Sequence, residues 1–202
     1  METTEHKWKI VSGGQTGVDR AGLAAAMELD IPFGGWVPGG RRAEDGRVPD
    51  YFRGMREHQK SNYQARTRAN VVDSDATLIL TDRFPLSRGT SLTVRIAAEI
   101  GRPCKIVHVS NPAAAAKTIA DWMLELEKLP LPASGRGFRI LNVAGSRESV
   151  APGIFEKAKA VLLLAFANLT EPADSRYESG DGGFGELMAA ERADADCHWS
   201  KE

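Results

Sequence analysis

The sequence predicts an α/β fold, with helices on both faces of a doubly wound, mainly parallel sheet. Two observations carry this prediction. Short apolar runs alternate along the chain with segments whose apolar residues recur at helical spacing, as in βαβ units. One run, Ala76 to Leu80 (ATLIL), is continuously apolar, which is typical of a strand buried on both faces. A sheet of this kind gathers the carboxyl ends of its strands, and the loops that follow them, along one edge.

The individual elements follow from the same patterns. The first strand carries Trp8, Ile10 and Val11 and is followed by a glycine turn, Ser12 to Gly17. The predicted strands are 8–11, 31–37, 76–80, 104–109 and 139–144, and the predicted helices are 18–29, 62–72, 91–100, 112–129 and 154–169. Residues 38–51 are irregular and rich in glycine, proline and charge, as functional loops often are.

The composition changes beyond Thr170. Residues 171–185 are rich in glycine and acid, which predicts a flexible tether, and residues 186–195 form a polar helix candidate. We therefore expect one ligand-binding domain over 1–170 and a C-terminal extension over 171–202.

The composition and charge of the chain exclude several classes of function. The 202 residues carry a formal net charge of -1 and a pI of about 6.4, which gives no reason to expect nucleic-acid binding. No apolar run is long enough to span a bilayer, and the N-terminus lacks the apolar core of a signal peptide. Cys104, Cys197 and four scattered histidines form no metal-type pattern, so we expect no metal site. Two cysteines that form no disulfide framework fit a protein of the reducing cytoplasm best.

Four loops follow predicted strands, at 12–17, 37–47, 81–90 and 145–149, and we expect them at one sheet edge. Glycine lets a ligand approach the backbone, and arginine binds oxyanions in a bidentate manner, so together they indicate phosphate recognition. The first loop also precedes a helix, whose N-terminal N–H groups attract anions. The candidate ligand-binding residues are Gly13, Gly14, Gln15, Thr16, Gly17, Gly39, Gly40, Arg41, Gly89, Thr90, Gly145, Ser146, Arg147 and Glu148.

Asp19 and Glu148 are the candidate catalytic residues, but these two and some of the glycines and arginines also have purely structural interpretations. Asp19 follows Thr16 in a T-x-x-D pattern and could close a capping box instead of acting in catalysis. Gly22 is better explained by close helix–sheet packing than by ligand contact. Arg41 could be a solvated loop charge, and Glu148 could stabilise a first helical turn instead of serving as an acid or base.

Three common motifs are absent from the sequence. GGQTGVD does not match the G-x-G-x-x-G dinucleotide fingerprint, and no acidic residue closes the second strand. No Gly-Lys-Ser/Thr follows a glycine loop, and there is no G-x-S-x-G elbow. The sequence therefore disfavours a standard dinucleotide fold, a P-loop enzyme and an α/β-hydrolase.

Five segments resemble the molybdenum cofactor carrier proteins: IVSGGQTGVDRAGLAAA, GWVPGGRRAEDG, YQARTRANVVDSDATLIL, RGTSLT and LNVAGSRES. This family belongs to a Rossmann-like superfamily (SLOG) that also contains the lonely-guy (LOG) phosphoribohydrolases, formerly mislabelled lysine decarboxylases. The resemblance runs from about Ile10 to about Glu156. It implies a homo-oligomer, a dimer or tetramer, that binds a phosphorylated ligand at the strand ends. For the carriers that ligand is molybdenum cofactor, a pterin dithiolene with a terminal phosphate.

The resemblance also bears on catalysis. The LOG enzymes have P-G-G-x-G-T-x-x-E, whose glutamate acts on an N-glycosidic bond. Here Gly89 and Thr90 are kept, but Thr93 stands where that glutamate would be. A hydroxyl cannot replace a carboxylate as general acid or base near neutral pH. We therefore favour a carrier or sensor of molybdenum cofactor or a related nucleotide-like ligand. The alternative is a nucleoside-monophosphate hydrolase, in which Glu148 or Asp19 would have to serve as acid or base. A partner-binding role of the tail is a third hypothesis.

Overall fold

The computed structural model describes residues 6–59, 62–131 and 136–170. The chain divides into two units, Met1–Thr170 and Glu171–Glu202. The second unit, with the predicted tether and polar helix, lies outside the described residues, so the division into a domain and an extension stays a prediction.

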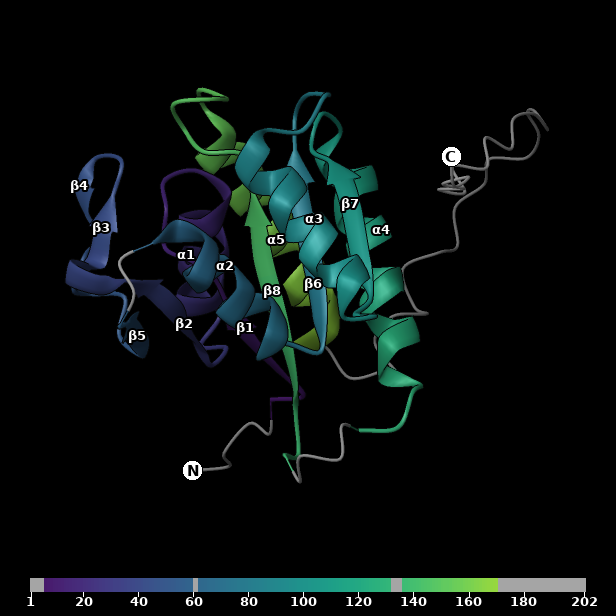
Figure 1. Ribbon diagram of the computed structural model, residues 1–202. Helices are drawn as coiled ribbons and strands as arrows, with labels where there is room; N and C mark the ends of the chain where they lie inside the picture. The colour runs from purple at the N-terminus through teal and green to yellow at the C-terminus, as the bar shows by residue number, and fades with distance from the viewer. Residues whose placement is uncertain (1–5, 60–61, 132–135, 171–202) are drawn as a thin grey trace, which may run out of the picture. The chain divides into compact units, whose positions relative to one another are not determined.

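A parallel sheet of six strands forms the centre of the first unit (Figure 1). The strand order is β5-β2-β1-β8-β6-β7, and every neighbouring pair is parallel. The strands are β1 (Trp8–Val11), β2 (Phe33–Pro38), β5 (Met55–His58), β6 (Ala76–Thr81), β7 (Cys104–His108) and β8 (Arg139–Gly145). All six residues of β6 are buried, as its continuous apolar run predicts.

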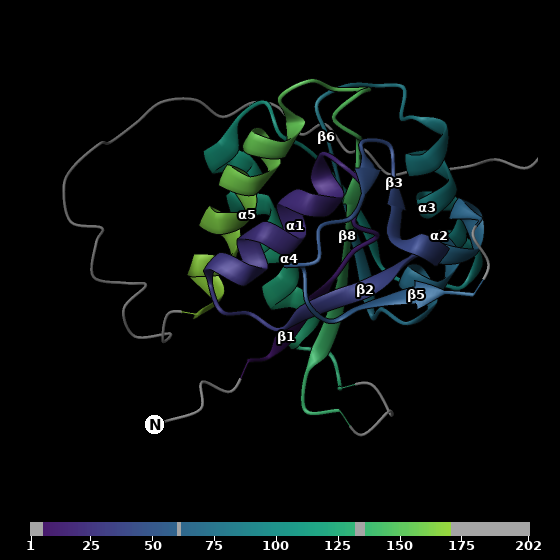
Figure 2. The same cartoon turned by 90° about the vertical axis from the view of Figure 1, so that its left-hand side faces the viewer.

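Within the described residues, five α-helices cover the two faces of this sheet. They are α1 (Val18–Glu28), α2 (Tyr63–Val72), α3 (Arg88–Glu99), α4 (Pro112–Glu127) and α5 (Ile154–Thr170). Helices α1, α4 and α5 pack together on one face, and α2 and α3 pack together on the other (Figure 2). Gly22 lies where α1 meets β8, because a Cβ there would approach Val143 to 2.9 Å. Its interpretation as a packing residue is confirmed.

The connections place a topological switch point between β8 and β6. The β1–β2 and β7–β8 crossovers move toward the β5 edge over the α1 face. The β5–β6 and β6–β7 crossovers move toward the β7 edge over the α3 face. All four therefore share one hand, as right-handed crossovers do. Because β8 leads to α5 and the adjacent β6 leads to α3, their loops diverge to opposite faces, which leaves the crevice where such folds bind ligands.

The sequence prediction missed two features. β5 was not expected, because three of its four residues (MREH) are polar and all four are half-buried or exposed at the sheet edge. The irregular segment contains a short antiparallel hairpin, β3 (Arg42–Ala43) and β4 (Gly46–Arg47), which pairs only with itself. In addition, α3 begins at Arg88 and not Ser91, because Ser87 caps it by accepting from the Thr90 N–H.

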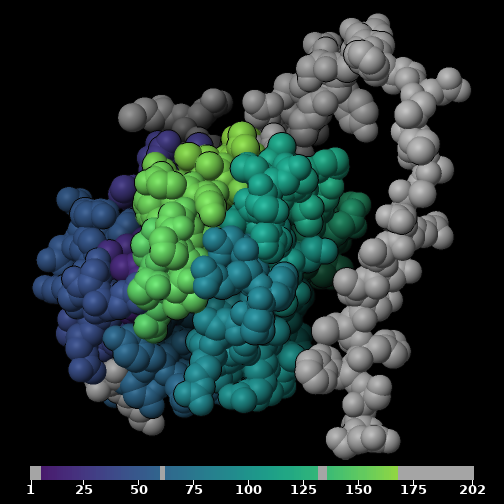
Figure 3. All heavy atoms as spheres, turned by 90° about the horizontal axis from the view of Figure 1, so that it is seen from above, coloured from purple at the N-terminus to yellow at the C-terminus, as the bar shows by residue number. Residues whose placement is uncertain are grey.

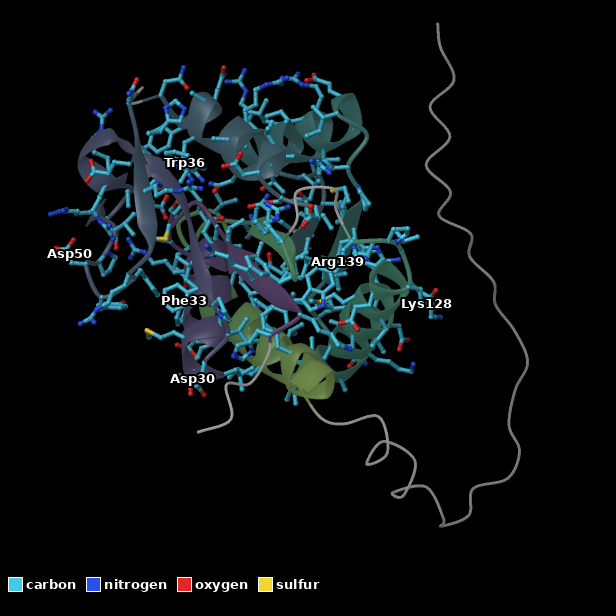
Figure 4. All side chains as sticks on the ribbon, turned by 90° about the horizontal axis from the view of Figure 1, so that it is seen from below. Asp30, Phe33, Trp36, Asp50, Lys128 and Arg139 are labelled. Carbon is cyan, nitrogen blue, oxygen red and sulfur yellow. The ribbon has the colours of Figure 1, made fainter. Side chains whose placement is uncertain are left out.

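The strand starts and the glycine loops lie at opposite ends of the sheet. Phe33 and Arg139 lie at the starts of β2 and β8, on the side seen from below in Figure 4. The glycine loops follow the other strand ends, at the top of Figure 1. None of the described helices is long and apolar enough to cross a membrane.

Candidate functional site

A cavity of about 530 Å³ lies at the switch point. Figure 3 shows the carboxyl ends of the strands from above. The segment after β8 (green) lies between the region of β2 to β5 (blue) and the region of α3 (teal). The lining residues come from the loops after β1, β6 and β8, from the carboxyl end of β8, and from the first turns of α1, α2 and α3. They are Gln15, Asp19, Tyr63, Gln64, Arg66, Thr67, Ser87, Arg88, Gly89, Thr90, Leu92, Thr93, Ala144, Gly145, Arg147 and Val150. The volume is within the range of small-molecule sites.

The N-terminus of α3 forms one wall of the cavity. Arg88 and Gly89 are its first residues, and N–H groups at these positions have no acceptor within a helix. A Cβ at Gly89 would meet nothing within 4 Å. Thr90 fixes this helix end to β8, because its hydroxyl donates to the Gly145 carbonyl at 3.1 Å. This wall can therefore receive an anion on its backbone N–H groups.

A buried ion pair forms the floor of the cavity. Arg66 of α2 and Asp19 of α1 are 7% exposed each, and the Arg66 guanidinium donates to Asp19 Oδ2 at 3.3 Å. Asp19 Oδ2 also accepts from the Gln15 N–H at 3.2 Å. Burial raises the pKa of Asp19, against the opposing effects of Arg66, the Gln15 N–H and Arg147. Gly13 leaves the space for this pair, because a Cβ there would overlap the Arg66 guanidinium.

Arg147, in the loop after β8, supplies a second guanidinium. It lies 5.3 Å from the centre of the Tyr63 ring, over its face. Of the described residues that line the cavity, three are arginines (Arg66, Arg88 and Arg147) and one is a carboxylate (Asp19). The lining therefore carries an excess of positive charge beside an aromatic ring.

The first glycine loop is placed differently from our expectation. Only Gln15 of its five candidate residues lines the cavity. The loop after β8 closes the N-terminus of α1, because the Val18 N–H donates to the Ser146 carbonyl at 3.1 Å and a Cβ at Gly17 would overlap that carbonyl. At this edge the N-terminus of α1 is thus covered by the loop after β8, whereas Arg88 and Gly89 at the N-terminus of α3 line the cavity.

The second loop also departs from the expectation. Gly39, Gly40 and Arg41 do not line the cavity. The buried Arg41 guanidinium donates to the carbonyls of Val48, at 3.2 Å, and Pro49, at 2.8 Å. Its hydrogen-bonding capacity is used to hold the segment after the hairpin. The structure thus gives Arg41 a structural role outside the cavity, and a phosphate contact by Arg41 stays a prediction.

Glu148 does not line the cavity either. Its carboxylate accepts from the Gly153 N–H at 2.5 Å and the Phe155 N–H at 3.0 Å, at the start of α5. This is the structural role of an acid at a helix N-terminus. Ser146 is likewise buried behind the wall, with its hydroxyl 3.3 Å from that of Thr81.

Replacing Glu148 by glutamine tests this role. The amide keeps one acceptor oxygen, so we expect a loss of about 1 kcal/mol in the free energy of unfolding. Ligand affinity is expected to stay unchanged. Chemical denaturation and ligand titration of the same preparation measure both quantities, and a large loss of affinity with normal stability would return Glu148 to the site.

The structure brings Gln15, Gly89, Thr90, Gly145 and Arg147 together, with Asp19. The start of α2, with Tyr63, Gln64, Arg66 and Thr67, was missed because β5, the strand before α2, was not predicted, so the sequence placed no loop before α2 at this edge. Its sequence signal is weak, since nothing in YQARTRANVV marks Arg66 as the buried arginine. Thr93 lines the cavity, but its hydroxyl donates to the Gly89 carbonyl at 3.1 Å within its own helix.

Comparison with known families agrees with this architecture. The model of the circularly permutated YpsA SLOG family matches residues 10–166. The chain belongs to this family. Comparison with curated proteins gives no match. A crystal structure from Syntrophus aciditrophicus SB, provisionally named a molybdenum carrier protein, is 38% identical, with a TM-score of 0.69. The similarity covers 78% of this chain and 93% of that protein.

Proposed function

We propose that this SLOG-family protein binds and carries a phosphorylated small molecule, with molybdenum cofactor as the first candidate, in the cavity at the β8–β6 switch point. The observation that carries the proposal is the charge of the lining, in which three guanidinium groups accompany a single carboxylate among the described residues. A phosphate at the N-terminus of α3 would accept from backbone N–H groups beside Arg88 and Gly89.

The remaining lining residues favour a ligand with a ring. Tyr63, with the Arg147 guanidinium over one face of its ring, adds aromatic surface, and Leu92 and Val150 add apolar surface. A cavity of about 530 Å³ is large enough for a planar heterocycle together with its phosphate. The provisional name of the similar Syntrophus protein adds support for molybdenum cofactor over other phosphorylated heterocycles.

Purified protein provides the first test. Its absorbance spectrum and metal content report bound pterin, nucleotide or molybdenum. Titration with molybdenum cofactor and with nucleoside monophosphates then ranks the ligands. We expect saturable binding that is tightest for molybdenum cofactor. A protein that saturates with none of these ligands would contradict the proposal.

A second candidate function is hydrolysis of the N-glycosidic bond in a nucleoside monophosphate. One observation favours it: Asp19 is a cavity-lining carboxylate whose pKa is raised by burial, as in many general acids. Its Oδ2 oxygen is already engaged by Arg66 and the Gln15 N–H, which weighs against this role. Release of free base by the wild type, lost in Asp19→Asn, would establish the hydrolase.

We further propose a homo-oligomer, a dimer or tetramer, located in the cytoplasm. Leu164 of α5 keeps 50% of its surface exposed and is a candidate contact between copies. Light scattering on the wild type and on Leu164→Glu measures the mass of the assembly. A wild type that stays monomeric at high concentration would contradict this proposal.

A further inference from the structure

The tip of the β3–β4 hairpin places the Glu44 carboxylate against the loop after β1 and the loop after β8. Oε1 accepts from the Thr16 hydroxyl and from the Ser149 N–H, the latter at 3.3 Å. Oε2 accepts from the Ser149 hydroxyl at 2.6 Å and lies 3.8 Å from the Arg147 guanidinium. The side chain of Glu44 is only 19% exposed, although it stands at the tip of a surface hairpin.

The groups that contact Glu44 are of the kinds that bind oxyanions in proteins. Two hydroxyls, one backbone N–H and one guanidinium converge on a single carboxylate, and the same donors bind phosphate oxygens. Burial acts to raise the pKa of Glu44, yet hydrogen bonds from Ser149 and Thr16, together with Arg147, hold it below its ordinary value. The surroundings thus favour a negative charge at this point.

The donors are continuous with the cavity. Arg147 pairs with Glu44 and also lines the cavity, where its charge affects Asp19 and Arg66. Thr16 directly follows Gln15, which lines the cavity as well. We call Thr16, Arg147 and Ser149 the oxyanion cradle.

The hairpin that carries Glu44 is a small element. β3 and β4 have two residues each and belong to a sheet of their own. Besides Glu44, its tip is held by Asp45, which pairs with Arg20 through two hydrogen bonds of 2.6 and 2.7 Å. The strands of the hairpin are also held by Gln15, which donates to the Arg42 carbonyl at 3.0 Å, and by Arg20, which donates to the Arg47 carbonyl at 3.5 Å. Rotation of the Glu44 side chain away from the cradle breaks only its contacts with Thr16, Ser149 and Arg147 among the hydrogen bonds and ion pairs of the described residues, and none within the central sheet.

We propose that the oxyanion cradle is a phosphate subsite that the Glu44 carboxylate occupies in this structure, and that an incoming phosphate displaces it. Glu44 then acts as an internal competitor, and the hairpin as a strap that responds to the ligand. The role of the hairpin in regulating the cavity rests on the proposed function. The phosphate subsite itself does not, because binding of inorganic phosphate is enough to detect it.

Titration calorimetry of the full chain with inorganic phosphate and pyrophosphate tests the proposal. Glu44→Ala removes the competitor and should raise the affinity for inorganic phosphate about tenfold or more over the wild type. Glu44→Gln keeps the shape of the side chain but loses its charge, so it should raise the affinity for inorganic phosphate by a smaller factor. If Glu44→Ala does not fold, Glu44→Gln provides the test. Adding Ser149→Ala to Glu44→Ala should remove the gain.

Glu57→Ala is the matched control. Its carboxylate accepts from the Gly40 N–H at 2.7 Å in the same region of the chain but does not contact the cradle, so phosphate affinity should not change. Equal or weaker phosphate binding by both Glu44 variants would overturn the proposal and leave Glu44 as a structural latch. A gain in phosphate affinity by protein that binds no molybdenum cofactor would support the subsite while contradicting the proposed function.

Discussion

Replacing Arg66 by alanine is expected to destabilise the protein by about 3–5 kcal/mol and to abolish ligand binding. Arg66 is the buried guanidinium that pairs with Asp19, and both side chains are 7% exposed. Without it, a carboxylate remains buried with the Gln15 N–H as its other hydrogen-bond partner. Urea denaturation measures the loss of stability, and ligand titration measures the loss of affinity.

The double variant Asp19→Leu/Arg66→Met separates the two effects. Replacing both members of a buried ion pair by apolar side chains is often close to neutral for stability. We expect this variant to recover most of the lost stability while ligand binding stays absent. If Arg66→Ala costs less than about 1 kcal/mol, or if the double variant binds ligand like the wild type, the ion pair is not the floor of the site.

Gly89→Ala is expected to change stability and affinity in opposite directions. The residue has no positive φ, and a Cβ would meet nothing within 4 Å, so alanine should stabilise α3 by up to about 1 kcal/mol. Because the new methyl group would stand where the ligand approaches the helix N-terminus, affinity should fall about tenfold, at a cost comparable to one hydrogen bond to a charged group. Gly89→Leu should abolish binding.

Gly137→Ala is the control for this prediction. Gly137 also has open space around it, but it does not line the cavity. Its substitution should leave ligand affinity at the wild-type value. Unchanged affinity in Gly89→Leu would show that the ligand does not approach the N-terminus of α3.

Apolar patterning predicted the fold well. Runs such as ATLIL in β6 and the helical spacing in α4 and α5 are dictated by the central sheet and the core beneath it, so they are visible locally. β5 was missed because an edge strand needs little apolar character. The β3–β4 hairpin was missed as well, although Asp45-Gly46 is a known turn signal.

The site was predicted less completely, for physical reasons. The sequence places loops at one edge, but it does not show which helix N-terminus stays open. Here the Ser146 carbonyl closes α1, while α3 remains open beside Gly89. It also cannot distinguish Arg41, whose guanidinium holds backbone carbonyls, from Arg147, which lines the cavity. In the sequence both arginines closely follow a glycine, Arg41 directly after Gly40 and Arg147 two residues after Gly145.

Equilibrium titration of the wild type, Arg147→Ala and Arg95→Ala with molybdenum cofactor tests the central claim most directly. Arg95 is an exposed arginine of α3, 69% exposed at its side chain and paired with Glu99, so it serves as the matched control. We predict saturable binding by the wild type and Arg95→Ala, and affinity at least about tenfold weaker in Arg147→Ala. Absence of saturable binding by the wild type, or equal affinity in all three proteins, would contradict the account.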